Sequence, residues 1–168
     1  MCGIVGYVGT QDAQAVLLQG LSRLEYRGYD SAGIAVVQEG HVRVSKAKGR
    51  LANLEARLEN DPLRGTIGIG HTRWATHGEP SDLNAHPHTD VKGDIAVVHN
   101  GIIENHKQLR AMLEKQGCVF VSQTDTEVVA HLLCTLYHGD MADALRRATA
   151  MLEGSWALCV LCQDTPDT

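Results

Sequence analysis

The chain starts with Met1 followed by the apolar run Cys2-Gly3-Ile4-Val5-Gly6-Tyr7-Val8, which predicts a buried first strand. Removal of Met1 leaves Cys2 with a thiol and a free α-amine on one residue. An α-amine titrates near pKa ~8 and can therefore accept a proton close to neutral pH. Such an amine can activate the thiol beside it as a nucleophile. The alternative is a thiol without chemistry, because free cysteine is commonly buried.

Composition indicates one globular domain. The 168 residues are 43% apolar and 21% charged, and the net charge is -5. A net negative charge argues against nucleic acid or an anionic membrane as partner. No run approaches the ~18 apolar residues of a membrane span, and no signal segment precedes the first strand, so we expect a cytoplasmic location. The five cysteines lack the spacing of a disulfide framework, which agrees with a reducing compartment.

No metal or other cofactor is expected. Cys159 and Cys162 form a C-x-x-C pair, but they lie in a predicted strand, where residues three apart point to opposite faces. No second cysteine pair accompanies them. Five histidines lie between residues 71 and 99, and they match no H-E-x-x-H or comparable ligand pattern: His71, His77, His86, His88 and His99.

The order of predicted elements mixes hairpins with helices, which is typical of an α+β fold with helix layers on its sheets. Apolar periodicity predicts helices at 11–27, 51–58, 106–116, 126–137 and 141–152. Strands are predicted at 2–8, 34–37, 42–47, 66–71, 95–99, 119–121 and 155–163. Glu39-Gly40 is expected to form a hairpin turn, and Gly28 to end the first helix. Asn105 is a candidate cap for the helix at 106–116, and Asp125 or Thr124 for the helix at 126–137.

Four features after Cys2 predict an acyl-transfer site. Arg73 follows a strand and can hold a carboxylate through two parallel hydrogen bonds. Asn100-Gly101, expected at a strand end, offers a side-chain amide and a backbone N–H for an oxyanion hole. Asp125 can bind an ammonium group. The polar loop at 71–88, which contains Trp74 and Thr76-His77-Gly78, can close over a ligand.

Together these features favour an α-amino acid whose side-chain carbonyl is attacked, and glutamine fits. Each also has a structural alternative. Arg73 can pair with a surface acid, Asn100-Gly101 is a frequent turn dipeptide, and Asp125 can be a helix cap alone. Residue types and spacing do not decide between the two interpretations.

Five runs carry a resemblance to a known family. They are Met-Cys-Gly-Ile-Val-Gly at the start, RLEYRGYDSAGIAVV at 23–37, HTRWATHGEPSDLNAHPH at 71–88, VHNGIIENH at 98–106 and TDTEVVAHL at 124–132. The chain resembles the class II glutamine amidotransferases, a family of N-terminal-nucleophile enzymes, along essentially its whole length. Within them it looks like the glutaminase domains of bacterial-type glucosamine-6-phosphate synthases, the isomerising glutamine:fructose-6-phosphate aminotransferases.

The resemblance implies a role for each matching position. Cys2 is the nucleophile, its own α-amine is general base and acid, and Asn100 with the Gly101 N–H forms the oxyanion hole. The remaining matching positions are implied to bind L-glutamine or close over it: Arg73, Thr76 and His77 at the α-carboxylate, Asp125 at the α-amine, Trp74 in the closing loop, and His86 at a further position of that loop.

The resemblance also implies a four-layer αββα sandwich. It implies that residues 1–168 are a glutaminase domain whose last strands continue beyond Thr168. The sugar-phosphate isomerase domains that bind fructose-6-phosphate lie outside this chain, and the full-length family member is expected to be a homodimer. Two alternatives stay open: the glutaminase domain of another class II amidotransferase, and a truncated fragment without catalysis.

Overall fold

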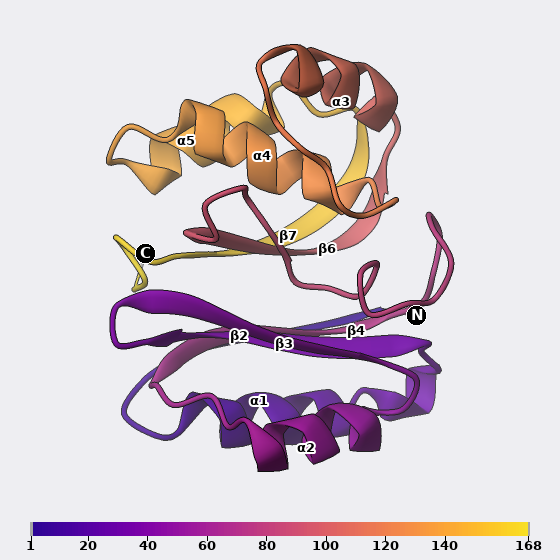
Figure 1. Cartoon of the computed structure of the whole chain (residues 1–168), viewed down its shortest axis with the longest axis vertical. Coiled ribbons are helices and arrows are strands. Elements are labelled where there is room, and N and C mark those ends of the chain that lie inside the picture. The colour runs from indigo at the N-terminus through magenta and orange to yellow at the C-terminus, as the bar shows by residue number, and fades with distance from the viewer. Residues whose placement is uncertain (1, 168) are drawn as a thin grey trace.

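The computed structural model describes residues 2–167 and has four layers in the order helix, sheet, sheet, helix (Figure 1). The first sheet has the strand order β1 (Gly3–Val8), β4 (Ile67–Arg73), β2 (Ser31–Gln38) and β3 (His41–Lys48), with all neighbours antiparallel. Its outer face is covered by α1 (Ala13–Ser22) and α2 (Leu51–Asn60). The short helix η1 (Glu25–Arg27) follows α1.

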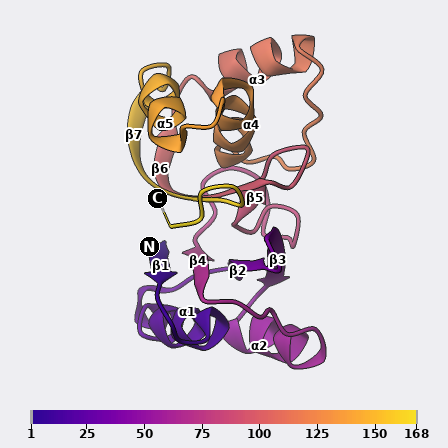
Figure 2. The same cartoon turned by 90° about the vertical axis from the view of Figure 1, so that its left-hand side faces the viewer.

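The second sheet is smaller and has the order β5 (His88–Thr89), β6 (Ile95–Ile103) and β7 (Gly154–Cys162), also antiparallel. Its outer face carries α3 (His106–Lys115), α4 (Thr126–Leu136) and α5 (Met141–Thr149). The side view shows the two helix layers on opposite outer faces (Figure 2). The predicted αββα sandwich is therefore confirmed. None of the described helices combines the length and apolar character needed to cross a membrane.

Three apolar cores hold the layers together. The core under the first sheet and the core over the second are built on large side chains of the helices, among them Leu17, Leu21 and Leu54 in the one and Val128, Leu132 and Leu133 in the other. The core between the sheets consists of small and medium residues: Ala35, Ile69, Ala96, Val98 and Leu161. Burial of these apolar surfaces supplies the main driving force for the fold.

Strand alternation carries polar side chains into the layer between the sheets. Successive residues of a strand point to opposite faces, so residues two apart share a face. Apolar residues of the inter-sheet core are thus followed or preceded on the same face by polar ones: Ile69 by His71 and Arg73 in β4, Val98 by Asn100 in β6, and Ile4 by Cys2 just before β1. The fold therefore brings groups from three segments to one place.

The first predicted helix is interrupted. Asp12 caps α1 by accepting a hydrogen bond from the Ala15 N–H, and the helix ends at Ser22. The Leu24 N–H then bonds to the Leu21 carbonyl, an i→i−3 contact, and η1 follows. Gly28, with a φ of 74°, therefore ends η1, and the prediction that it ends the first helix is wrong. The predicted hairpin turn at Glu39-Gly40 is confirmed, with both residues at positive φ.

Asn100 and Gly101 do not lie at a strand end, and neither do they form a turn. β6 continues to Ile103, with Asn100 opposite Ala157 and Gly101 opposite Trp156 in β7. Gly101 has a φ of 126°, and a Cβ there would lie 2.0 Å from the Ser155 carbonyl oxygen. The strand can pass through this point because glycine has no side chain.

β7 is less buried than predicted, because it lies at the edge of its sheet. Between Trp156 and Cys162 only Leu161 and Cys162 are buried. Cys159 packs in the inter-sheet core and Cys162 in the core beneath the second helix layer, so the prediction that they point to opposite faces is confirmed. All five cysteines are free thiols in the described part of the chain.

The predicted strand at 119–121 is wrong, because the segment pairs with a side chain rather than with another strand. The Glu127 carboxylate of α4 accepts hydrogen bonds from the Val121 and Ser122 N–H groups at 2.8 and 2.7 Å, and from the Ser122 hydroxyl at 2.6 Å. Burial raises the pKa of the Glu127 carboxyl, but hydrogen bonds from His131, Ser122 and Val121 outweigh burial and lower it to about 2.

Glu127→Gln is expected to destabilise the protein by about 2 kcal/mol at pH 7, because an amide cannot accept all of these bonds and its NH₂ faces backbone donors. The depressed pKa of Glu127 means that its stabilisation is present above the unfolded value of 4.5 and is lost as the pH falls toward about 2. The free energy of unfolding in urea, compared between wild type and Glu127→Gln at pH 7 and at pH 3, measures both effects. The exposed Glu114→Gln is the control. Equal midpoints for wild type and Glu127→Gln at pH 7 would contradict the prediction.

Candidate functional site

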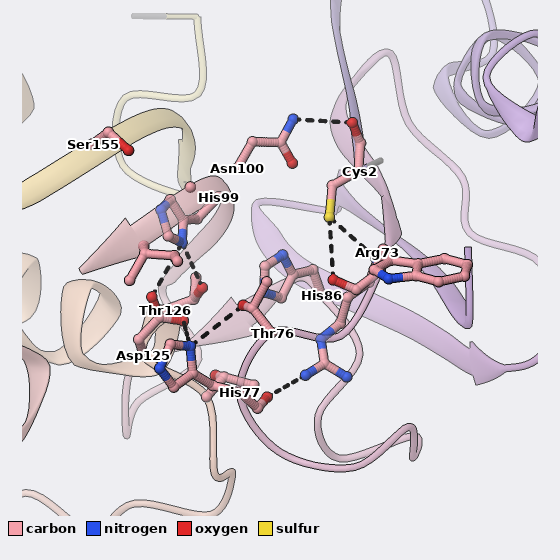
Figure 3. A pocket seen from close by; sticks show the side chains of 14 residues that line it. Cys2, Arg73, Thr76, His77, His86, His99, Asn100, Asp125, Thr126 and Ser155 are labelled. Carbon is pink, nitrogen blue, oxygen red and sulfur yellow. Dashed lines mark hydrogen bonds and ion pairs between the residues drawn. The ribbon is translucent and has the colours of Figure 1, made fainter. Parts of the chain in front are cut away.

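One pocket of about 730 Å³ brings together all nine residues that the sequence predicts for the site (Figure 3). They come from the start of the chain, the end of β4 and the loop after it, β6, and the residue before α4: Cys2, Arg73, Trp74, Thr76, His77, His86, Asn100, Gly101 and Asp125. The pocket gathers the predicted groups, while their individual roles stay predictions.

The Cys2 thiol is held against the start of the loop that follows β4. The Trp74 N–H donates to Sγ of Cys2 at 3.1 Å, and Sγ lies 3.5 Å from the Trp74 carbonyl oxygen. Cys2 is only partly buried, so its sulfur is open to the pocket that it lines. The position suits attack on a ligand bound between this loop and β6.

The Asn100 amide points toward Cys2 (Figure 3). Its Nδ2 donates to the Cys2 carbonyl oxygen at 3.4 Å, and its Oδ1 lies 2.8 Å from Nε2 of His71. Gly101 follows in a backbone conformation that non-glycine residues rarely adopt. A side-chain N–H₂ group and a glycine backbone thus line the same pocket as the thiol, and these are the donor types of an oxyanion hole.

Arg73 is a buried cation, and one of its nitrogens makes no hydrogen bond among residues 2–167. Its Nη2 donates to the carbonyl oxygens of His77 and Gly78. In the described part of the chain Nη1 is buried without a hydrogen bond, and it lies 3.7 Å from Oδ1 of Asp30. Burial lowers the pKa of Arg73 and Asp30 opposes this effect. Arg73 therefore does pair with an acid, as its structural alternative expects, but the pair is not at the surface: Arg73 is 3% exposed and lines the pocket, where it can meet a ligand anion.

Asp125 is not a helix cap by its side chain. The Asp125 side chain makes no capping bond, and its Oδ2 accepts a hydrogen bond from the Ile103 N–H at 2.8 Å instead. Oδ1 lies 3.8 Å from Nδ1 of His77, and that nitrogen is 3.3 Å from the Thr76 hydroxyl. Asp125 is 3% exposed, so the pocket contains a buried carboxylate suited to a ligand ammonium.

The candidate cap Asn105 also makes no capping bond; its side chain bonds to Met151 and Glu153. The Thr124 hydroxyl accepts a hydrogen bond from the Glu127 N–H in the first turn of α4 at 3.4 Å.

Buried histidines surround the Asn100 side of the pocket. Nδ1 of His86 lies 3.3 Å from Nε2 of His71, and the rings of His86 and His88 meet edge to face at 4.9 Å. Burial lowers the pKa of His71 to about 4 and those of His86 and His88 well below the ordinary value. The three rings are therefore neutral at pH 7. No group of three His, Cys, Asp or Glu side chains among residues 2–167 is arranged to hold a metal.

Five further residues line the pocket without having been predicted as ligand-binding residues: His99, Ile102, Thr124, Thr126 and Ser155. His99 entered the sequence analysis only as a candidate metal ligand, and its Nδ1 lies 2.9 Å from the Thr126 hydroxyl. Thr124 and Thr126 flank Asp125, so their position in the sequence could have identified them. No local sequence signal marks Ser155, because it reaches the pocket only through the pairing of β6 with β7.

Comparisons with known proteins find relatives that match nearly the whole chain. The chain is 61% identical to the glutamine–fructose-6-phosphate aminotransferase (isomerizing) of Symbiobacterium thermophilum and 60% identical to that of Caldanaerobacter subterraneus, over 99% of this chain. It spans only 27% and 28% of the length of these relatives.

Solved structures show the same fold. Glutamine phosphoribosylpyrophosphate amidotransferase from B. subtilis superposes with a TM-score of 0.82 at 30% identity, covering 97% of this chain and 35% of the other. A second structure, described as the allosteric regulatory enzyme of purine biosynthesis, gives 0.84 at 30% identity, covering 97% and 36%. Residues 71–167, more than half of the chain, match the family model of the glutamine amidotransferase domain. The chain therefore belongs to the class II glutamine amidotransferase domain family.

Proposed function

We propose that the chain is the glutaminase domain of an isomerising glutamine:fructose-6-phosphate aminotransferase. It hydrolyses L-glutamine to glutamate and ammonia through a thioester on Cys2, and further domains of the protein use the ammonia. One observation carries the proposal: a single pocket holds a thiol, an amide donor, a buried guanidinium with one nitrogen that makes no hydrogen bond to the described residues, and a buried carboxylate. These groups complement the side-chain amide, the α-carboxylate and the α-ammonium of glutamine.

Binding uses the two charged ends of the substrate. Arg73 receives the α-carboxylate through Nη1, supported by Thr76 and His77. Asp125 accepts hydrogen bonds from the α-ammonium group. Both side chains are already held by backbone groups, Arg73 by the carbonyls of the loop and Asp125 by the Ile103 N–H. Little ordering is therefore needed when glutamine binds, and its side-chain carbonyl is directed toward Cys2.

The chemical step starts with Met1 removed. The α-amine of Cys2 takes the thiol proton, and the sulfur attacks the amide carbon of glutamine. The oxyanion is stabilised by Nδ2 of Asn100 and the N–H of Gly101. The α-ammonium returns its proton to the leaving nitrogen, the C–N bond breaks and ammonia departs. Water, deprotonated by the same amine, then attacks the thioester and releases glutamate and the thiol.

Trp74 and His86 lie at the wall of this pocket. Trp74 is 55% exposed and belongs to the loop whose backbone contacts Sγ of Cys2, so its movement can open or close the site. His86 is buried and lines the pocket next to His71. We assign Trp74 to closure over the substrate and give His86 a part in the wall of the site.

The ammonia acceptor is proposed from the relatives. Identity is about 60% to enzymes named for fructose-6-phosphate, against 30% to the phosphoribosylpyrophosphate amidotransferase. This difference favours fructose-6-phosphate, bound by domains outside residues 1–168, over another acceptor. We further propose a cytoplasmic location, supported by the five free thiols, and a homodimer as in the family that the sequence resembles. The negative net charge supports the absence of nucleic-acid and anionic-membrane partners.

Release of glutamate from L-glutamine tests the proposed function, with L-asparagine as the matched control substrate. Asparagine has the same charged ends, but its amide lies one methylene closer to them and does not reach Cys2. We expect thiol-dependent turnover of glutamine and little of asparagine. Absence of glutamine hydrolysis after Met1 removal would instead support the alternative of a non-catalytic fragment.

Arg73→Lys is expected to raise KM for glutamine by about 10- to 100-fold and to change kcat by less than about threefold. A lysine ammonium cannot both bond to the two loop carbonyls and present a second nitrogen to the α-carboxylate. Steady-state glutaminase kinetics measure this, and Arg110→Lys on α3 is the control. An unchanged KM would show that Arg73 does not bind the substrate.

A further inference from the structure

The orientation of the Asn100 amide follows from its two neighbours. The Cys2 carbonyl oxygen, 3.4 Å away, can only accept a hydrogen bond, so the amide nitrogen must face it. The amide oxygen then faces Nε2 of His71 at 2.8 Å. An oxygen that only accepts requires a donor, so Nε2 of His71 must carry a hydrogen.

The surroundings of His71 keep its ring fixed and neutral. The side chain is fully buried in β4 between the two sheets, and burial lowers its pKa to about 4. A neutral imidazole has a single N–H, and the Asn100 contact places that hydrogen on Nε2. Nδ1 of His86 lies 3.3 Å from the same nitrogen and acts there as a second acceptor, because Nε2 has only one hydrogen to share.

We propose that His71 is a positioning residue for the oxyanion hole: its Nε2–H holds the Asn100 amide with Nδ2 directed toward Cys2. The inference rests on the proposed glutaminase function. His71 does not line the pocket and acts through Asn100, without touching the substrate.

The physical need for such a residue lies in the asparagine side chain itself. The terminal torsion of asparagine is broad and nearly twofold, so rotation by 180° exchanges the amide oxygen and nitrogen at little intrinsic cost. The exchanged amide presents an oxygen to the developing oxyanion, which repels it. The Nε2–H of His71 and the Cys2 carbonyl oxygen together oppose this alternative, because the exchanged amide would set N–H against N–H on one side and oxygen against oxygen on the other.

Two substitutions of His71 separate positioning from simple packing. Glutamine places its amide nitrogen close to the position of Nε2, whereas asparagine is one methylene shorter and cannot reach Asn100. We expect His71→Gln to keep kcat within about threefold of wild type, and His71→Asn to lower kcat by about 10- to 100-fold with KM for glutamine within about threefold. The buried His131→Asn in α4 is the control and should keep the wild-type kcat. Equal loss in both His71 variants, or wild-type kcat in His71→Asn, overturns the proposal.

A double-mutant cycle tests whether His71 acts through Asn100. If it does, His71→Asn/Asn100→Ala is as slow as Asn100→Ala alone, because no amide remains to be oriented. A purely structural contribution of His71 makes the two losses multiply, and that result overturns the proposal.

The tautomer of His71 can be read in the unmodified protein and does not depend on activity or on the folding of a variant. ¹⁵N NMR of the histidine rings at pH 7 is expected to show His71 protonated at Nε2 and unprotonated at Nδ1. Protonation at Nδ1, or an imidazolium, overturns the proposal. Failure of the proposed function has a different signature: wild-type protein without glutaminase activity, whatever the tautomer of His71.

Discussion

Cys2→Ala is expected to lower kcat for glutamine hydrolysis by about 10⁴-fold or more, because the variant has no atom that can form the thioester. Residual turnover then depends on water attacking a bound and polarised amide. Glutamate release by the purified variant after Met1 removal measures the effect. Cys118→Ala, at a half-buried thiol outside the pocket, is the control and should keep the wild-type rate.

Glutamine binding should survive the same substitution. In the proposed binding mode the charged ends of the substrate are held by Arg73 and Asp125, and the Cys2 sulfur makes its hydrogen bonds with Trp74 instead. Calorimetric titration of Cys2→Ala with glutamine is expected to give binding within about threefold of the wild-type KM, provided that KM reports binding. Substantial hydrolysis by Cys2→Ala would refute the thioester mechanism.

Asn100→Ala is expected to lower kcat by about 10²- to 10³-fold with little change in KM. The amide nitrogen points toward Cys2. Its hydrogen bond to the substrate oxygen becomes stronger when negative charge develops on that oxygen, so loss of the amide affects the transition state more than the bound substrate.

The matched control is Asn105→Ala. Asn105 bonds to Met151 and Glu153, away from the pocket, so its loss is expected to affect stability but not kcat. A rise in KM without a fall in kcat for Asn100→Ala would place Asn100 in ground-state binding rather than in an oxyanion hole.

The layers of the fold could be predicted from local patterns. Alternation and apolar runs gave the strands around Ile4, Ile34 and Ile95, and 3.6-residue periodicity gave the helices that present Leu17 and Leu54 to the first sheet. The predicted strand boundaries were wrong where pairing with a neighbouring strand outweighs the local conformational preference of the residues. Asn100-Gly101 has the composition of a turn, but β7 pairs with β6 along the whole length of β6, and this pairing keeps both residues in the strand.

Part of the site could also be predicted from local sequence. Arg73 and Asp125 stand out because charged residues directly after a strand or before a helix are easily recognised, and Cys2 because of its place in the chain. His71 and Glu127 did not stand out, because their partners Asn100 and Val121 come from elements that only the tertiary fold brings close. Hydrogen bonding of buried polar groups across layers leaves no periodic pattern in the sequence.

The most direct test of the account is the intact mass of the protein before and after reaction with a diazo-ketone analogue of glutamine, with glutamine as protectant. We expect loss of Met1 and a single adduct, located on Cys2 and suppressed by excess glutamine. Retained Met1 with no adduct, or an adduct that glutamine does not suppress, would contradict the claim that Cys2 is the nucleophile of a glutamine-binding site.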